Sequence, residues 1–309
     1  MEFDTRLTSL LLPCLLPRIS VDAERSFQPP ETILMRRALI IGPGGLRGAY
    51  SGGVVATLCR AFGHGFFNRI YGCSAGAYTG SYAASGQPDK IESIWRDCVH
   101  SDLLVSLSKV ITKRRPFLDL FYLNDILRSD SYRLSIERML SSPTTFEIVA
   151  TDSETGEPHY FTPDSEESFF LQVRASAAVP VIHPRVPIGG RAYVDGGLSD
   201  PIPLERALAD GCDEIVIVSN RPVTNIGRLA SIFLSVYSSY TSQASDNQVK
   251  ERLTRVVDLT ERLAGRVHII TPSSEHSHRW QFDSEHATLN ELVDLGIKDA
   301  TTFITNCKW

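Results

Sequence analysis

The pentapeptide Gly72-Cys73-Ser74-Ala75-Gly76 has the residue types and spacing that hold a serine nucleophile on a sharp turn. A G-x-S-x-G segment between a strand and a helix pushes the serine hydroxyl clear of the backbone, and the flanking glycines relieve the crowding of that turn. Apolar residues precede the pentapeptide, and a small, helix-compatible run follows it at 77–84. Short patterns of this kind also occur by chance, so other stretches must supply the chemical partners of Ser74.

A glycine-rich loop, Gly42-Pro43-Gly44-Gly45-Leu46-Arg47-Gly48, lies upstream of that serine. The apolar run before it, at 35–41, predicts a buried parallel strand, and the apolar spacing over 49–62 predicts a helix. A strand, a glycine loop and a helix together present backbone N–H groups to an anion. The loop therefore has two interpretations, a dinucleotide-binding turn and an oxyanion hole for acyl transfer.

The oxyanion hole is the better interpretation of this loop. In a dinucleotide fingerprint the third glycine would fall one place earlier than Gly48, and no acidic residue closes a strand about 20 positions further on. An acyl-transfer serine needs N–H donors aimed at the charge that develops on the carbonyl oxygen, and Ser74 follows the loop.

A candidate base comes from the segment 191–197, Arg-Ala-Tyr-Val-Asp-Gly-Gly. Its β-prone residues deliver Asp195 at a strand end, and the two glycines allow the backbone to turn away so that the carboxylate approaches another loop. The alternative is an Asp-Gly-Gly turn in which the carboxylate caps its own backbone. A second acid, Asp152, lies in a hairpin-like stretch at 151–161 and is expected to be a structural cap.

The apolar patterns predict alternating strands and helices along most of the chain. Further strands are expected at 146–150, 214–218 and 267–270, and further helices at 89–99, 201–210, 247–264 and 285–304. This alternation predicts an α/β fold, a three-layer, mostly parallel, doubly wound sheet with helices on both faces and the site at the strand carboxyl ends.

We expect one domain over residues 35–309, preceded by an extension, 1–34, that packs on the domain or anchors it loosely. Residues 100–144 mix apolar and basic side chains, which fits a lid that touches a membrane or an ordinary helical insertion.

Composition restricts the class of protein. The chain has 309 residues, 42% of them apolar, and a formal net charge of -5, which argues against nucleic acid as a partner. Its six cysteines form no C-x-x-C pair, so neither a zinc site nor a disulfide framework is expected, and free thiols indicate a reducing compartment. The apolar stretch 10–16 is too short for a spanning helix and lacks the flanks of a signal peptide. We therefore expect a cytoplasmic or peripherally membrane-associated protein.

Three stretches, 44–48, 72–76 and 195–197, resemble in this order the signature set of the patatin-like phospholipases. The segments 150–161 and 175–184 also look like connecting segments of that family, and the resemblance covers about residues 36–220, with a tail similar to a bacterial branch. One position departs from the pattern, because the family usually has a third glycine where this chain has Pro43. Proline has no N–H to donate, whereas Gly44 and Gly45 retain theirs.

The resemblance implies a Ser–Asp dyad without a catalytic histidine, and the sequence itself indicates neither a metal nor a cofactor. Ser74 would be the nucleophile and Asp195 the base, with the N–H groups of Gly44 and Gly45 forming the oxyanion hole. Arg47 would support the loop or meet a substrate phosphate. An ordinary aspartate, with a pKa of about 3.9, is a weak base, so such a site must be partly desolvated to raise that pKa.

The expected function is a serine acyl hydrolase of phospholipase A or lysophospholipase type that acts on lipid carboxylic esters. One alternative is a Ser-Asp-His esterase. The histidines downstream of Asp195 that could complete it are His268, His276, His278 and His286. The other alternative is a non-hydrolytic lipid- or nucleotide-binding regulator that keeps the glycine loop.

Overall fold

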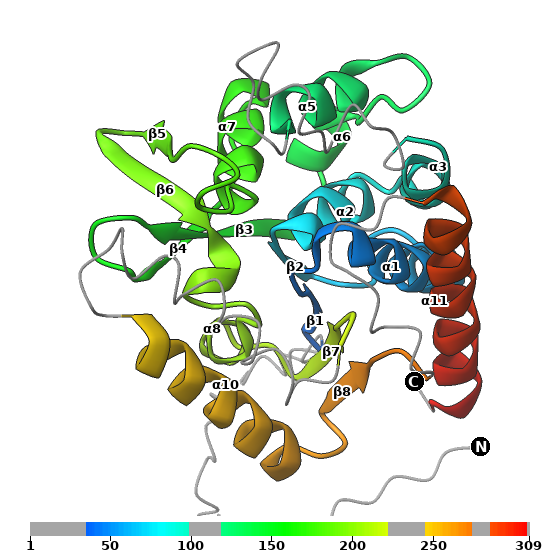
Figure 1. Cartoon of the computed structure of the whole chain (residues 1–309). Coiled ribbons are helices and arrows are strands. Elements are labelled where there is room, and N and C mark those ends of the chain that lie inside the picture. Colours follow the sequence, from blue (N-terminus) through cyan, green and yellow to red (C-terminus); the bar gives the residue numbers. More distant parts are fainter. Residues whose placement is uncertain (1–34, 99–118, 222–244, 274–284, 308–309) are drawn as a thin grey trace, which may run out of the picture. The chain divides into compact units, whose positions relative to one another are not determined.

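The computed structural model describes residues 35–98, 119–221, 245–273 and 285–307. The expected extension, 1–34, and the residues 100–118 of the expected lid lie outside these ranges. Within them, one sheet has the strand order β5-β6-β3-β2-β1-β7-β8, and β4 pairs with β3 off this path (Figure 1). The strands are β1 (Arg37–Ile41), β2 (Arg69–Cys73), β3 (Thr145–Asp152), β4 (Pro158–Phe161), β5 (Val186–Ile188), β6 (Arg191–Asp195), β7 (Glu214–Val218) and β8 (Val267–Ile270).

The sheet has a parallel part and an antiparallel part. Strands β1, β2, β3, β7 and β8 run parallel, whereas β4 and β6 pair antiparallel with β3, and β5 pairs antiparallel with β6. The β5–β6 connection consists of Gly189 and Gly190, both at positive φ, which is the geometry of a tight two-residue hairpin. The predicted doubly wound α/β architecture is confirmed, with this antiparallel edge added.

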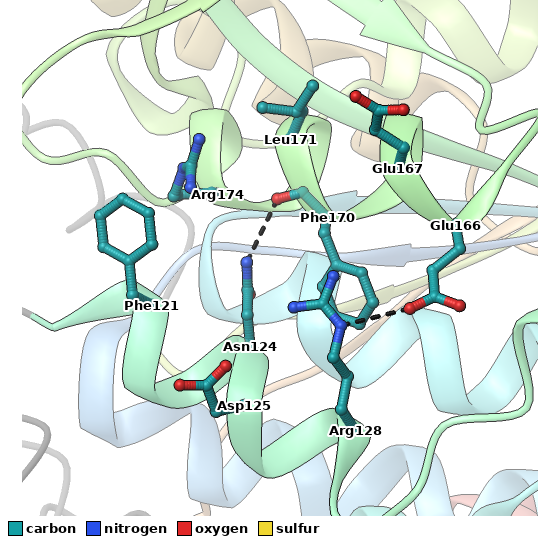
Figure 2. A pocket seen from close by; sticks show the side chains of 9 residues that line it. All are labelled: Phe121, Asn124, Asp125, Arg128, Glu166, Glu167, Phe170, Leu171 and Arg174. Carbon is teal, nitrogen blue, oxygen red and sulfur yellow. Dashed lines mark hydrogen bonds and ion pairs between the residues drawn. The ribbon is translucent and has the colours of Figure 1, made fainter.

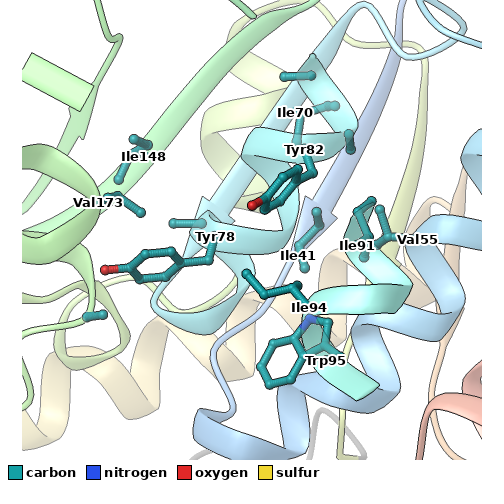
Figure 3. Close-up of a cluster of buried hydrophobic side chains, with 14 of the residues drawn as sticks. Ile41, Val55, Ile70, Tyr78, Tyr82, Ile91, Ile94, Trp95, Ile148 and Val173 are labelled. Atoms are coloured by element: carbon teal, nitrogen blue, oxygen red, sulfur yellow. The ribbon is translucent and has the colours of Figure 1, made fainter. Parts of the chain in front are cut away.

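Alternate residues of the central strands point to opposite faces of the sheet, and each face has its own apolar core. In β1, Leu39 and Ile41 belong to the larger core, and Ala38 and Ile40 belong to the smaller one. Figure 3 shows part of the larger core, including Ile41, Tyr82 and Trp95.

The larger core is covered by α1 (Gly48–Phe62), α2 (Ala75–Ala84), α3 (Pro88–Asp97), α5 (Leu120–Arg128), α6 (Ile136–Leu140), α7 (Glu166–Ser176) and α11 (His286–Asn306). The smaller core is covered by α8 (Leu204–Ala209) and α10 (Ser245–Arg262).

Part of the segment expected to form a lid or an insertion lies within the described residues. Helices α5 and α6 bury Leu120, Leu127 and Met139 in the larger core, so both helices pack against the domain. No helix in the described ranges is both long enough and apolar enough to cross a bilayer.

Candidate active site

Ser74 occupies the turn between β2 and α2, as the pentapeptide predicts. Its backbone has φ 54° and ψ -123°, a conformation that costs energy for a residue with a side chain. A methyl group on Gly72 would come within 2.6 Å of the Ala77 Cα, and one on Gly76 within 2.8 Å of the Gly42 carbonyl oxygen. The two glycines therefore let the start of α2 pack directly against the ends of β1 and β2.

The strand register brings Asp195 to the level of Ser74. Cys73 of β2 pairs with Val149 of β3, and the next residue of β3, Ala150, pairs with Asp195 of β6. Ser74 and Asp195 therefore stand on the two sides of one strand, and the Ser74 hydroxyl lies close enough to the Asp195 carboxylate to lower the pKa of that carboxylate. Both residues are buried, with 7% and 6% of their surfaces exposed.

The Asp195 carboxylate has two partners. Its Oδ1 accepts the Gly197 N–H at 2.8 Å, so the capped Asp-Gly-Gly turn considered as an alternative is present as well. The same carboxylate reaches the Ser74 hydroxyl. Capping its own turn fixes the side chain in the orientation that meets the serine.

Burial raises the pKa of Asp195 from 3.8 to about 6, while the hydrogen bonds from Ser74 and from the Gly197 N–H lower it. Desolvation is the larger effect because the carboxylate lies inside the protein with no cation beside it among the groups that shift its pKa. This is the direction that a carboxylate base needs, since a higher pKa makes it a stronger proton acceptor at neutral pH.

We expect kcat/KM to fall as the pH decreases through about 6. The ionised carboxylate is the form that can accept a proton, and its fraction drops about tenfold for each pH unit below the pKa. The measurement is kcat/KM for a soluble ester between about pH 4.5 and about pH 8.5. An acidic limb centred near the ordinary aspartate pKa of about 3.9 would contradict a desolvated base.

The end of α7 holds both members of the Ser–Asp pair. The Ser176 Oγ accepts the Ser74 N–H at 2.9 Å, and the Ala178 carbonyl oxygen accepts the Asp195 N–H at 3.0 Å. Sequence reasoning identified the segment 175–184 only as a connection, because a serine at a helix end carries no signal of this contact.

The glycine loop lies beside the same pair. Gly45 begins a short 3-10 helix, Gly45–Arg47, with φ 58°, and a methyl group on Gly197 would come within 3.3 Å of the Pro43 ring. Within the described ranges, no hydrogen bond is formed by the N–H groups of Gly44 and Gly45. These two donors are therefore available to a ligand. Arg47 is buried where this 3-10 helix leads into α1.

The described histidines do not bond the Ser–Asp pair. His268 lies in β8, separated from β2 by β1 and β7, with its ring 5.8 Å from that of Phe303. His286 is exposed at the start of α11, and His276 and His278 lie outside the described residues. No hydrogen bond in the described part of the chain joins a histidine to Ser74 or Asp195.

A pocket of about 410 Å³ lies between α5 and α7 (Figure 2). The Arg174 guanidinium covers the Phe121 ring at 4.4 Å, and Arg128 forms an ion pair with Glu166 at 3.2 Å. Neither Ser74 nor Asp195 lines it. The pocket is therefore a separate concavity from the Ser–Asp pair. No group of acidic, histidine and cysteine side chains suited to a metal ion occurs among the described residues.

Comparison with known proteins places the chain in a family. It is 27% identical over 225 residues to YjjU, an uncharacterised protein of Escherichia coli K12, covering 68% of this chain and 58% of that protein. It is 28% identical over 184 residues to the uncharacterised NTE family protein Rv1063c of Mycobacterium tuberculosis H37Rv, covering 60% and 49%. The chain thus spans about half to three-fifths of these relatives.

Among solved structures, VipD from Legionella pneumophila aligns with a TM-score of 0.42 and 15% identity, over 84% of this chain and 67% of that one. The family model described as "Patatin-like phospholipase" matches residues 39–208, which is more than half of the chain and includes the glycine loop, Ser74 and Asp195. The chain belongs to the patatin-like phospholipase family.

Proposed function

We propose that the chain is a lipid hydrolase, specifically a serine acyl hydrolase of phospholipase A or lysophospholipase type. The observation that carries this proposal is the proximity of the Ser74 hydroxyl to the buried Asp195 carboxylate, which is close enough for the hydroxyl to lower the pKa of that carboxylate. A desolvated carboxylate on a serine hydroxyl is the arrangement of a base and its nucleophile. Membership of the patatin-like phospholipase family supports carboxylic esters of lipids as the substrate class.

In the acylation step, the Ser74 Oγ attacks the ester carbonyl carbon while its proton passes to the Asp195 carboxylate. The carbonyl electrons become a negative charge on oxygen, which the N–H groups of Gly44 and Gly45 stabilise. When the tetrahedral intermediate collapses, the bond to the leaving alcohol breaks and the alcohol oxygen takes the proton from Asp195. The product is an acyl ester of Ser74.

Deacylation repeats these steps with water. Asp195 accepts a proton as the water oxygen attacks the acyl carbonyl carbon, and it returns that proton to the Ser74 Oγ as the acyl–serine bond breaks. A free carboxylic acid leaves, and the dyad is restored. The buried Arg47 supports the glycine loop in this scheme.

Contact with a lipid surface is part of the proposal. Two large apolar side chains, Phe121 and Val181, are 47% and 68% exposed. The Phe121 ring lies 6.3 Å from the ring of His183, which is two positions after Val181 in the chain. Phe121 and Val181 are therefore near the segment 176–183, whose first residues bind the backbone of Ser74 and Asp195. These two exposed apolar side chains would favour peripheral binding of the protein to a lipid surface.

Labelling with a fluorophosphonate tests the hydrolase against a non-hydrolytic lipid- or nucleotide-binding regulator. An activated serine attacks the phosphorus, expels fluoride and keeps a stable adduct. We expect mass spectrometry to locate that adduct on Ser74. No adduct under conditions in which a control hydrolase is fully labelled would overturn the hydrolase and favour the regulator.

A further inference from the structure

Asn220, two residues beyond the end of β7, reaches across to the glycine loop. Its side chain is buried, with 3% of the residue exposed, and its Nδ2 donates a hydrogen bond to the Pro43 carbonyl oxygen at 2.9 Å. A carbonyl oxygen only accepts hydrogen bonds, so the amide nitrogen must face it. The contact joins residues that are 177 positions apart in the sequence.

The sheet register shows in which direction this hydrogen bond points. Ile41 of β1 pairs with Val218 on one side and with Gly72 of β2 on the other. The loop after β1, which contains Pro43, therefore leaves the sheet between the end of β7, which is followed by Asn220, and the end of β2, which is followed by Ser74. The Pro43 carbonyl faces the β7 side, because that is where Asn220 binds it.

The direction of the Pro43 carbonyl fixes the direction of the Gly44 N–H. In a trans peptide the C=O and the N–H of the same peptide plane point to opposite sides, and no peptide bond in the described residues is cis. With the Pro43 carbonyl held toward Asn220, the N–H of Gly44 points toward the β2 side, where Ser74 lies. This is one of the two N–H groups that form no hydrogen bond within the described ranges.

Side-chain packing holds the same peptide from both sides. Asn220 fills the space that a side chain on Gly44 would need, since a methyl group there would come within 2.7 Å of its Cγ. On the other side, the Pro43 ring packs against Gly197, whose N–H binds the Asp195 carboxylate. The peptide between Pro43 and Gly44 is thus fixed relative to both the β7 end and the turn that carries the base.

We infer that Asn220 is a positioning residue for the oxyanion hole. Asn220 holds the Gly44 N–H in line with the negative charge that develops on the carbonyl oxygen during ester hydrolysis. The inference rests on the proposed function. It also gives a physical role to Pro43, because a residue without an N–H contributes here through its carbonyl oxygen and its ring. The charge on oxygen exists only in the tetrahedral state, so Asn220 would act on the rate of the chemical step and not on substrate binding.

Two substitutions test this role. Asn220→Ala removes the amide, and Asn220→Asp keeps its shape but replaces the N–H donor with a carboxylate oxygen that repels the Pro43 carbonyl. For both we expect kcat on a soluble ester to fall by about 10- to 100-fold with KM changed by less than about threefold. A tetrahedral boronate analogue should lose affinity by a factor similar to that for kcat. Asn290→Ala, on α11 beside Arg96, is the control and should keep both constants.

The outcomes separate this inference from the proposed function. A wild-type protein that does not hydrolyse esters would overturn both the proposed function and the positioning role of Asn220. An active wild type with unchanged kcat in Asn220→Ala would overturn the positioning role alone, as would a fall in kcat/KM that comes only from KM. If Asn220→Ala does not fold, Asn220→Asp decides, and wild-type kcat in that variant overturns the role.

Discussion

Ser74→Ala is expected to abolish ester hydrolysis, with kcat falling by at least about 10⁴-fold. The hydroxyl is the group that forms the acyl intermediate, and neither the oxyanion donors nor Asp195 can replace it as a nucleophile. Alanine also fits the site, because the Ser74 N–H keeps its bond to the Ser176 Oγ. The measurement is the steady-state rate on a soluble ester and on phospholipid vesicles, with the melting temperature as the test of folding.

Ser81→Ala is the matched control for this loss. Ser81 lies on the same helix, α2, and is fully buried, but its hydroxyl donates to the Tyr78 carbonyl oxygen of its own helix at 2.7 Å. We expect this variant to retain the wild-type kcat. A Ser74→Ala protein that folds and still hydrolyses esters at more than a hundredth of the wild-type rate would place the nucleophile elsewhere.

Asp195→Asn is expected to reduce kcat by about 10³-fold or more while it stabilises the fold at neutral and alkaline pH. An amide cannot accept the proton of Ser74, which accounts for the kinetic loss. The gain in stability follows from the raised pKa. The folded-state pKa of about 6 exceeds the unfolded value of 3.8, so the buried carboxylate contributes most favourably below about pH 4, and this contribution is lost as the pH rises through about 6.

The size of this gain can be bounded. The difference between 3.8 and about 6 corresponds to roughly 3 kcal/mol above that pH, which the uncharged amide avoids. We expect a higher melting temperature for Asp195→Asn at about pH 8 and little difference from wild type at about pH 4. Melting curves at the two pH values measure this. A variant that is less stable than wild type at about pH 8 would show that Asp195 is a structural carboxylate, and retained activity would exclude it as the base.

Local sequence predicted much of the fold because the spacing of apolar residues indicates which faces of strands and helices are buried. Leu39 and Ile41 alternate with Ala38 and Ile40, and this alternation matches two separate cores on the two faces of the sheet. Asp152 was expected to be a structural cap, and this is confirmed, since its Oδ1 accepts the N–H groups of Glu154 and Thr155.

The β5–β6 hairpin was not predicted, although a signal for it exists. Gly189 and Gly190 join two short β-prone segments, and two consecutive glycines favour the positive φ angles of a tight hairpin. A segment of three residues such as β5 is too short to show an alternating pattern, so apolar spacing alone could not reveal it.

The sequence by itself determined the turn at Ser74, the glycine loop and a strand that ends in Asp195, because each depends on residues that are neighbours in the chain. Only the tertiary structure decided that Ser74 and Asp195 meet across Ala150, since strand register is a property of pairing between distant segments. The raised pKa of Asp195 likewise depends on burial by other elements. Ser176 and Asn220 bind backbone groups far away in the chain, and such contacts arise only when the sheet and its covering helices are assembled.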